Sequence, residues 1–209
     1  SSMSDTDKES ERESFLMGMF NIASGTAPIY AEILDLKNCS RLLDLGGGPG
    51  TYAIHFCLNN PELKATVFDL PTTRSFAKKT IASFNLSERI QFKDGSYLNE
   101  NIGLEQDYDA VWLSHILHGE GTENAQAIVA KAVKALKPGG KIFIHEFILN
   151  NSMDGPLFPA LFALNMLIGT DKGQAYSEAQ LEEMLEKCGI SNIHRLDIKT
   201  PNDAGIMMG

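Results

Sequence analysis

The chain has 209 residues, enough for one α/β domain with a substantial core. Its 27 acidic residues outnumber its 18 basic residues, and the formal charge of −9 argues against a nucleic-acid-binding surface, which is usually basic. The three cysteines are scattered without C-x-x-C spacing, so we expect neither a metal site nor a disulfide framework, and we expect a cytoplasmic setting. The longest apolar run, 157–168, is interrupted and too short to span a bilayer, so no membrane association is expected.

The N-terminal region is expected to form helices. The segment 5–20 gathers apolar side chains near one face, and a second helix is expected over 28–36, after the break at Ser24-Gly25. Packing against a core and covering a bound ligand both account for the first helix. We therefore assign residues 1–38 to helices that pack on or cover a cofactor site, and residues 39–209 to the main domain.

From residue 39 onward, short apolar strands alternate with helical segments. Strands are expected at 42–45, 65–69, 90–92, 108–113, 141–147 and 191–198, and a seventh is expected from residue 205. Helices are expected at 52–58, 72–84, 123–136, 156–168 and 177–188. This alternation predicts an α/β fold, a Rossmann-like doubly wound sheet of seven mostly parallel strands with helices on both faces.

A glycine-dense turn follows the first strand and reads Asp44-Leu45-Gly46-Gly47-Gly48-Pro49-Gly50. Such a turn lets a ligand approach bare backbone and directs the N–H groups of the next helix toward it. Asp69 ends the second strand, 23 residues after Gly46, which suits a carboxylate that accepts both hydroxyls of a ribose. The pair indicates an adenosine-containing ligand. The alternative is a tight turn with Asp69 as a helix cap.

Polar residues also follow the later strands, at the edge where parallel sheets bind their ligands. Asp94-Gly95-Ser96-Tyr97 follows the third strand, the fourth leads into Ser114-His115-Ile116-Leu117-His118, and the fifth ends at Glu146. A histidine can take a proton from a hydroxyl at neutral pH, and a neighbouring carboxylate fixes its tautomer. His118 is therefore the candidate general base and Glu146 its partner, with His115 as the competing candidate.

These motifs together resemble the class I S-adenosylmethionine-dependent methyltransferases. The segment 44–50 resembles their glycine motif. Residues 113–120 resemble the L-x-x-x-L-H-D-W segment of the small-molecule O-methyltransferases, the plant caffeic acid-type and hydroxyindole-type enzymes and their bacterial relatives, and residues 137–146 resemble their P-G-G-x-hydrophobic-E segment. The resemblance covers about residues 12–209. It implies that 39–209 is an S-adenosyl-L-methionine-binding domain that methylates a hydroxyl of a small, aromatic or polyketide-like acceptor.

The same resemblance implies residue roles. The expected cofactor-binding residues are Asp44, Gly46, Gly48, Asp69, Leu70, Asp94, Gly95, Ser96, Tyr97 and Ser114. His118 and Glu146 are the expected catalytic residues, and the expected substrate-side residues are Phe162, Asn165 and Met166. Asp94 is expected to substitute for an acid that the family carries where this chain has Ser96. A second acid that supports the family's histidine aligns with Ala175 and is missing.

The family usually carries an N-terminal winged-helix-like domain that forms the dimer and covers the partner's pocket. The chain is therefore expected to be a fragment of a longer homodimeric protein or a relative without that lid. Two other functions stay open. The glycine turn alone also suits a nicotinamide-dependent oxidoreductase, and the missing acid also suits a cofactor-binding module without catalysis. Thermal stabilisation by S-adenosylhomocysteine or by NAD would distinguish a methyltransferase from a nicotinamide-dependent oxidoreductase.

Overall fold

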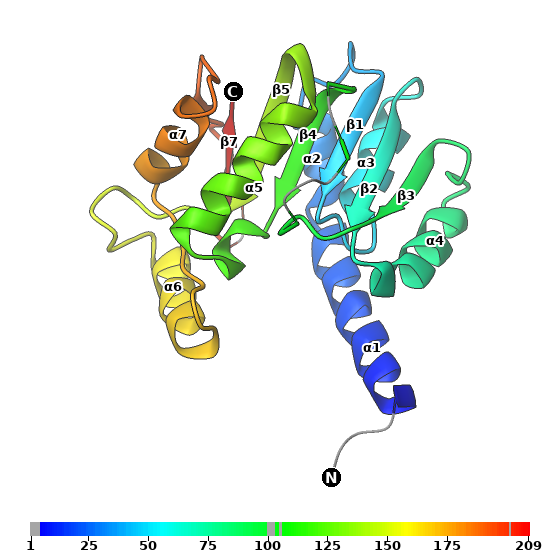
Figure 1. Cartoon of the computed structure of the whole chain (residues 1–209), viewed down its shortest axis with the longest axis horizontal. Helices are drawn as coiled ribbons and strands as arrows, with labels where there is room; N and C mark the ends of the chain where they lie inside the picture. The colour runs from blue at the N-terminus through cyan, green and yellow to red at the C-terminus, as the bar shows by residue number, and fades with distance from the viewer. Residues whose placement is uncertain (1–4, 100–102, 105, 201) are drawn as a thin grey trace. The chain divides into compact units, whose positions relative to one another are not determined.

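The computed structural model describes residues 5–99, 103–104, 106–200 and 202–209. The chain forms two compact units, Ser1–Ser96 and Tyr97–Gly209. Figure 1 traces them from the blue α1 to the red β7. The predicted boundary at residue 38 lies inside the first unit, and the assignment of 1–38 as a cover for the cofactor site stays a prediction.

The first unit alternates strands and helices as the sequence predicts. Its elements are α1 (Asp5–Ser24), α2 (Ala27–Ile33), β1 (Arg41–Leu45), α3 (Thr51–Asn59), β2 (Lys64–Asp69), the 3-10 turn η1 (Pro71–Thr73), α4 (Arg74–Ser83) and β3 (Ile90–Asp94). The strands are parallel in the order β3-β2-β1. Leu42 to Leu45 of β1 are all buried, as expected for a parallel strand that is covered on both faces.

A single arginine closes one end of this unit. The Arg89 guanidinium donates hydrogen bonds to the carbonyl oxygens of Cys57, Asn60 and Leu63, at the end of α3 and in the turn that leads to β2. The Cys57 carbonyl lies in the last turn of α3, where carbonyls have no partner inside the helix, and an arginine presents several donors in a fixed fork. The contact therefore ties the end of α3 to the turn that leads to β2.

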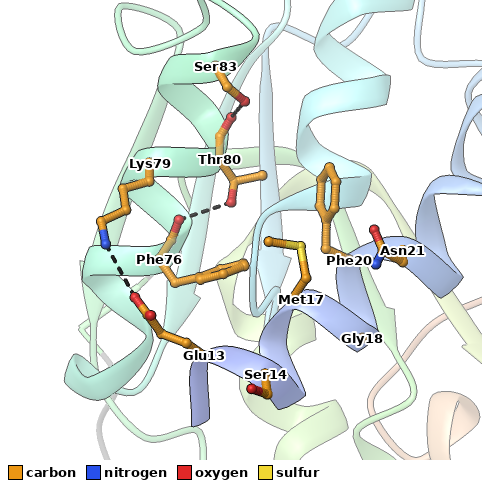
Figure 2. A pocket seen from close by; sticks show the side chains of 10 residues that line it. All are labelled: Glu13, Ser14, Met17, Gly18, Phe20, Asn21, Phe76, Lys79, Thr80 and Ser83. Carbon is orange, nitrogen blue, oxygen red and sulfur yellow. Dashed lines mark hydrogen bonds and ion pairs between the residues drawn. The ribbon is translucent and has the colours of Figure 1, made fainter. Parts of the chain in front are cut away.

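The helix α1 lies beside α4 with a groove between them, shown in Figure 2. At one end the rings of Phe20 and Phe84 lie 6.3 Å apart, and at the other Lys79 donates to Glu13 at 3.2 Å. The groove has a volume of about 820 Å³. Its lining residues are Glu13, Ser14, Met17, Gly18, Phe20, Asn21, Phe76, Lys79, Thr80 and Ser83. The helix predicted over 5–20 is confirmed and runs four residues further, to Ser24.

The second unit contains the remaining strands and helices. They are β4 (Tyr108–Ser114), the 3-10 turn η2 (Leu117–Gly119), α5 (Thr122–Ala135), β5 (Leu136–Glu146), α6 (Leu157–Gly169), α7 (Glu178–Glu186), β6 (His194–Arg195) and β7 (Gly205–Met208). The strand order is β4-β5-β7-β6, with β4 parallel to β5 and β7 antiparallel to both of its neighbours. The Trp112 ring is fully buried between Phe143 and His145.

The predicted α/β fold with seven strands is confirmed for the described residues, and the sheet is mixed because β7 is antiparallel. The strand predicted over 191–198 is wrong in length, because only His194–Arg195 is strand. Two causes are visible. Asn192 has a positive φ of 57°, which takes the chain out of extended geometry, and only Met207 and Met208 of β7 pair with β6.

The helix α6 is unusual in how little of its apolar surface is covered. Leu157, Leu167 and Ile168 are 74%, 72% and 86% exposed. Across the described residues, no helix combines the length and the apolar character that a bilayer-spanning segment requires.

Candidate active site

The glycine turn after β1 owes its shape to left-handed backbone at three positions. Gly46, Gly48 and Gly50 have φ angles of 71°, 52° and 80°. These are values that side chains disfavour. Gly50 is the N-cap of α3, and the Gly46 N–H donates to the Phe68 carbonyl oxygen of β2 at 2.8 Å. A Cβ at Gly48 would meet nothing within 4 Å. The turn therefore leaves open backbone beside the N-terminus of α3.

Asp44 lies beneath this turn and is completely buried. Its Oδ2 accepts a hydrogen bond from the Ala53 N–H at 3.3 Å, while its Oδ1 has no hydrogen-bond partner among the described residues. Gly47 is required above it, because a Cβ there would lie 2.6 Å from the Asp44 carboxyl carbon. Burial raises the pKa of Asp44 to about 7, against the lowering effect of the Ala53 hydrogen bond, and the charge of Asp69 adds to the rise. A cation nearby would stabilise the charged form of this carboxylate.

Asp69 links the glycine turn to the next helix. Its Oδ2 accepts from the Gly48 N–H at 2.7 Å, and its Oδ1 accepts from the Leu70 N–H at 2.6 Å and from the Thr73 hydroxyl at 3.3 Å. Neither η1 nor α4 has a side-chain cap, so the capping role that the sequence left open is not present. The side chain is half-buried, and Leu70 beside it is 49% exposed.

The segment after β3 is arranged differently from the prediction. The Asp94 carboxylate accepts a hydrogen bond from Arg74 Nε at 2.6 Å and forms a second contact with the same guanidinium. The pairing neutralises the acid that was expected to replace the family's missing one at Ser96. Gly95 packs against a buried ring, because a Cβ there would lie 2.2 Å from Phe68 Cζ.

In the second unit, Glu146 at the end of β5 organises the residues around it. It is 2% exposed, and its Oε1 accepts from the N–H groups of Leu117 at 2.9 Å and His118 at 3.3 Å. Its Oε2 lies 2.9 Å from His118 Nδ1. Burial alone would raise the pKa of Glu146, but the hydrogen-bonded imidazole of His118 and the nearby imidazole of His115 hold that pKa far below its usual range. A carboxylate facing Nδ1 keeps the proton on that atom, which leaves Nε2 of His118 as the acceptor.

His115 shares the same carboxylate oxygen. Its Nδ1 lies 3.5 Å from Glu146 Oε2, and its backbone has a positive φ of 54°. Its ring packs against the rings of His145 and Phe147, with centroids 4.4 and 4.5 Å away. The sequence left open which of the two histidines is the candidate base. In the structure both face the same Glu146 oxygen, and His118 lies closer to it.

Aromatic rings line the side of His118. Phe162 meets the histidine ring edge-on at 4.8 Å, and Phe147 lies 4.5 Å from Phe162 and 5.0 Å from Phe158. Of the three predicted substrate-side residues, Phe162 is brought to the histidine, while Asn165 is exposed and Met166 is half-buried. Phe147 and Phe158 were not predicted. The position of Phe147 directly after Glu146 was the available signal for it.

Two more of the predicted cofactor residues, Tyr97 and Ser114, lie in the second unit. The Ser114 hydroxyl lies 2.8 Å from Nδ1 of the buried His145, and the Tyr97 carbonyl oxygen accepts a hydrogen bond from Lys131 Nζ at 2.7 Å. Burial holds the pKa of His145 well below its ordinary value, assisted by His115 and opposed by Glu146. His145 is therefore neutral at pH 7 and anchors Ser114.

Backbone of the segment 173–175, where the sequence predicts that a supporting acid is missing, contacts His118. The Gln174 N–H donates to the His118 carbonyl oxygen at 2.8 Å, and the next residue, Ala175, is 2% exposed. A Cβ at Gly173 would lie 2.8 Å from the same carbonyl oxygen and 2.3 Å from Thr170 Oγ1. The segment 173–175 therefore holds the turn η2 through main-chain contacts.

The comparisons with known proteins agree with this geometry. The O-methyltransferase domain family matches residues 2–191. The 3-hydroxy-5-methyl-1-naphthoate 3-O-methyltransferase of Streptomyces sahachiroi is 33% identical over 94% of this chain and 56% of the relative. The acetylserotonin O-methyltransferase of Gallus gallus is 29% identical, over 88% of this chain and 52% of the relative.

Solved structures show the same fold. An O-methyltransferase family protein from Burkholderia thailandensis has a TM-score of 0.85 at 26% identity, covering 95% of this chain and 58% of that one. Human N-acetylserotonin methyltransferase in complex with SAM has a TM-score of 0.83 at 28% identity, covering 96% and 55%. The chain thus spans a little over half the length of these relatives. Because the family matches nearly the whole sequence, this chain belongs to the O-methyltransferase domain family.

Proposed function

We propose that this chain is the cofactor-binding and catalytic part of an S-adenosyl-L-methionine-dependent O-methyltransferase. Its acceptor would be a hydroxyl of a small aromatic or polyketide-like molecule. The observation that carries the proposal is the 2.9 Å contact between His118 Nδ1 and the buried Glu146 carboxylate, beside the ring of Phe162. Relatives named for a hydroxynaphthoate and for tetracenomycin polyketide synthesis support an aromatic acceptor.

The residues of the first unit fit the proposed cofactor. Asp44 has a buried, unpartnered carboxylate oxygen, which favours a positively charged group nearby. Gly48 presents open backbone and Gly46 has the left-handed backbone of the turn, while the half-buried Asp69 suits a ribose, with Leu70 beside it. When bound, the cofactor supplies a methyl group on a cationic sulfur.

The remaining proposed cofactor residues are the pair Gly95 and Ser96 in the first unit and the pair Tyr97 and Ser114 in the second. Asp94 has less support as a cofactor-binding residue than the others, because Arg74 already neutralises it. An Arg74→Gln variant tests this point. Stronger cofactor binding by that variant would show that Arg74 withholds Asp94 from the ligand, and unchanged binding would remove Asp94 from the set.

His118 is the proposed general base. Its Nε2 accepts the hydroxyl proton of the acceptor, and Glu146 holds the Nδ1 proton and stabilises the imidazolium that forms. A positioned base of this kind contributes roughly 10²–10⁴-fold to the rate. The rings of Phe147 and Phe162 exclude water and offer flat apolar surface to an aromatic acceptor.

The test combines cofactor binding with turnover. Thermal shift with S-adenosylhomocysteine and with NAD identifies the cofactor, and a screen of hydroxylated aromatics identifies the acceptor. On an acceptor found this way, His118→Ala should lower kcat roughly 10²–10⁴-fold and leave the S-adenosylhomocysteine shift intact. His194→Ala is the matched control, because His194 is exposed and bonds only the nearby Asn192 carbonyl among the described contacts. Full turnover by His118→Ala would refute the assigned base.

A cofactor-binding module without catalysis is the second candidate, favoured by the buried Ala175 where the family carries an acid. It predicts stabilisation by S-adenosylhomocysteine without methyl transfer to any acceptor. Stabilisation by NAD alone would instead indicate the oxidoreductase.

We also infer a cytoplasmic setting and a homodimer for the full-length protein. None of the three cysteines forms a disulfide, which suits a reducing compartment. The exposed apolar side chains of α6 offer surface for a partner. Light scattering of the full-length protein tests the dimer, and a monomer at micromolar concentration would refute it.

A further inference from the structure

Three potential metal ligands converge beside the proposed base. Each of His115, His118 and Glu146 has a ligand atom, an imidazole nitrogen or a carboxylate oxygen, that lies within 4.8 Å of those of the other two. The two histidines face the same carboxylate oxygen, at 3.5 and 2.9 Å. His115 Nδ1 is buried and has no hydrogen-bond partner among the described residues. The carboxylate therefore satisfies one imidazole well and leaves the other without a close partner.

We propose that His115, His118 and Glu146 bind a divalent transition-metal ion of zinc's class, and that this ion switches off the base. Two imidazole nitrogens and one carboxylate oxygen are ligands that zinc accepts. At bond lengths of about 2.1 Å, tetrahedral ligand atoms stand about 3.4 Å apart. The two separations from Glu146 Oε2, 2.9 and 3.5 Å, lie on either side of that spacing, and the ligand atoms of all three residues lie within 4.8 Å of one another.

The surroundings hold these ligands in place before an ion arrives. Glu146 Oε1 is anchored by the N–H groups of Leu117 and His118, which leaves Oε2 for the metal. The His115 ring is packed between His145 and Phe147. Outer contacts of this kind orient ligands and raise metal affinity. Three protein ligands also leave a fourth position for water.

The consequence for activity rests on the proposed function. A neutral imidazole carries one proton, which Glu146 now holds on Nδ1 of His118. A metal bond at Nδ1 uses the lone pair of that nitrogen, so the proton moves to Nε2. Nε2 then has no lone pair for the acceptor's proton. The ion thereby removes the base without occupying the acceptor's place. Zinc should lower kcat and leave the acceptor KM unchanged.

The binding test uses the metal alone. Calorimetric titration with zinc chloride should give a stoichiometry of about one, and Co²⁺ should give the visible absorption of a tetrahedral site with nitrogen and oxygen ligands. His115→Asn is the test variant, because asparagine tolerates the positive φ at this position and its amide is a poor zinc ligand. Since loss of an outer partner alone costs roughly 10–100-fold, loss of this ligand should weaken zinc binding at least about 100-fold. His194→Asn is the control and should bind zinc as the parent chain does.

Three results would overturn the inference: no zinc binding, equal zinc affinity in His115→Asn, or a cobalt–thiolate absorption band that assigns the ion to a cysteine. An unchanged S-adenosylhomocysteine shift in His115→Asn shows that the variant is folded. The two proposals fail separately. Methyl transfer that zinc does not affect would refute the ion switch and leave the proposed function standing. Zinc binding that depends on His115, without methyl transfer, would refute the function and leave the metal site.

Discussion

Replacing Asp44 by Asn should stabilise the chain at pH 8 far more than at pH 5. The Asp44 carboxyl group is completely buried, and its pKa is raised from 3.8 to about 7 by burial in the first place. A folded state that raises a carboxyl pKa binds more protons than the unfolded state between those two values. The free energy of unfolding therefore falls as the pH rises through this window. Asparagine has nearly the same shape, can still accept from Ala53 and carries no charge.

The magnitude follows from the size of the shift. A rise of a little over three pKa units corresponds to about 4 kcal/mol once the pH exceeds 7. At pH 5 the penalty is only about 1.5 kcal/mol, because the folded carboxyl group is still protonated there. The change in the free energy of unfolding caused by Asp44→Asn should therefore be about 3 kcal/mol more favourable at pH 8 than at pH 5. Any pH-independent cost of the amide cancels in this difference.

Urea denaturation of the parent chain and of the variant at both pH values gives this difference. Subtracting the two proteins removes the contributions of His55 and His145, whose pKa values burial lowers in both. Hydrogen exchange of the Ala53 amide, which donates to the Asp44 carboxylate, reports the local effect. A difference below about 1 kcal/mol would refute the assignment of Asp44 as a strained buried acid. If its unpartnered oxygen serves a cationic cofactor, the stabilised variant should also bind S-adenosyl-L-methionine more weakly.

Other changes probe the packing and the base. Gly95→Ala should destabilise the chain by about 1–3 kcal/mol in urea denaturation, because the new Cβ would lie 2.2 Å from a buried phenylalanine ring. Gly18→Ala, in an open part of α1, should instead stabilise it by up to about 1 kcal/mol, and similar effects of both would contradict the packing argument. Gly173→Ala pushes on the His118 carbonyl oxygen and should lower kcat by about 10–100-fold with the cofactor shift kept; unchanged kcat would show that this contact does not position the base. Glu146→Gln should cost about 3 kcal/mol at pH 7. That gap should begin to narrow as the pH falls below the ordinary glutamate value of 4.5 and should go on narrowing toward the lowered pKa of the folded state, and a constant gap would contradict the shared carboxylate.

Much of the part of the site that is proposed to bind the methyl donor could be predicted from the sequence, because it is local. The glycine turn, the buried strand before it and the acid at the end of the next strand are set by residue spacing along the chain. The turn does have left-handed glycines, and Asp69 does meet it through the Gly48 N–H. The helix limits were predicted to within a few residues for the same reason.

Contacts between residues far apart in sequence could not be predicted in this way. Asp94 is neutralised by Arg74, 20 residues earlier, and no local pattern announces that pairing. The strand expected over 191–198 shrinks to two residues, although β7 has four residues and pairs with β5 along all of them. How much of β7 pairs with this segment is not written in the segment's own sequence.

The sequence by itself determined the α/β alternation, the glycine turn and the candidate base, since each depends on periodicity or spacing within a short stretch. Only the tertiary structure decided that Glu146 serves two histidines at once, and that Phe162 of α6 packs on His118 while Phe147, just after β5, packs on His115. The physical reason is that a buried charge must find its partners in space. Glu146 and His118 stand 28 positions apart in the chain, yet Oε2 of one and Nδ1 of the other lie 2.9 Å apart.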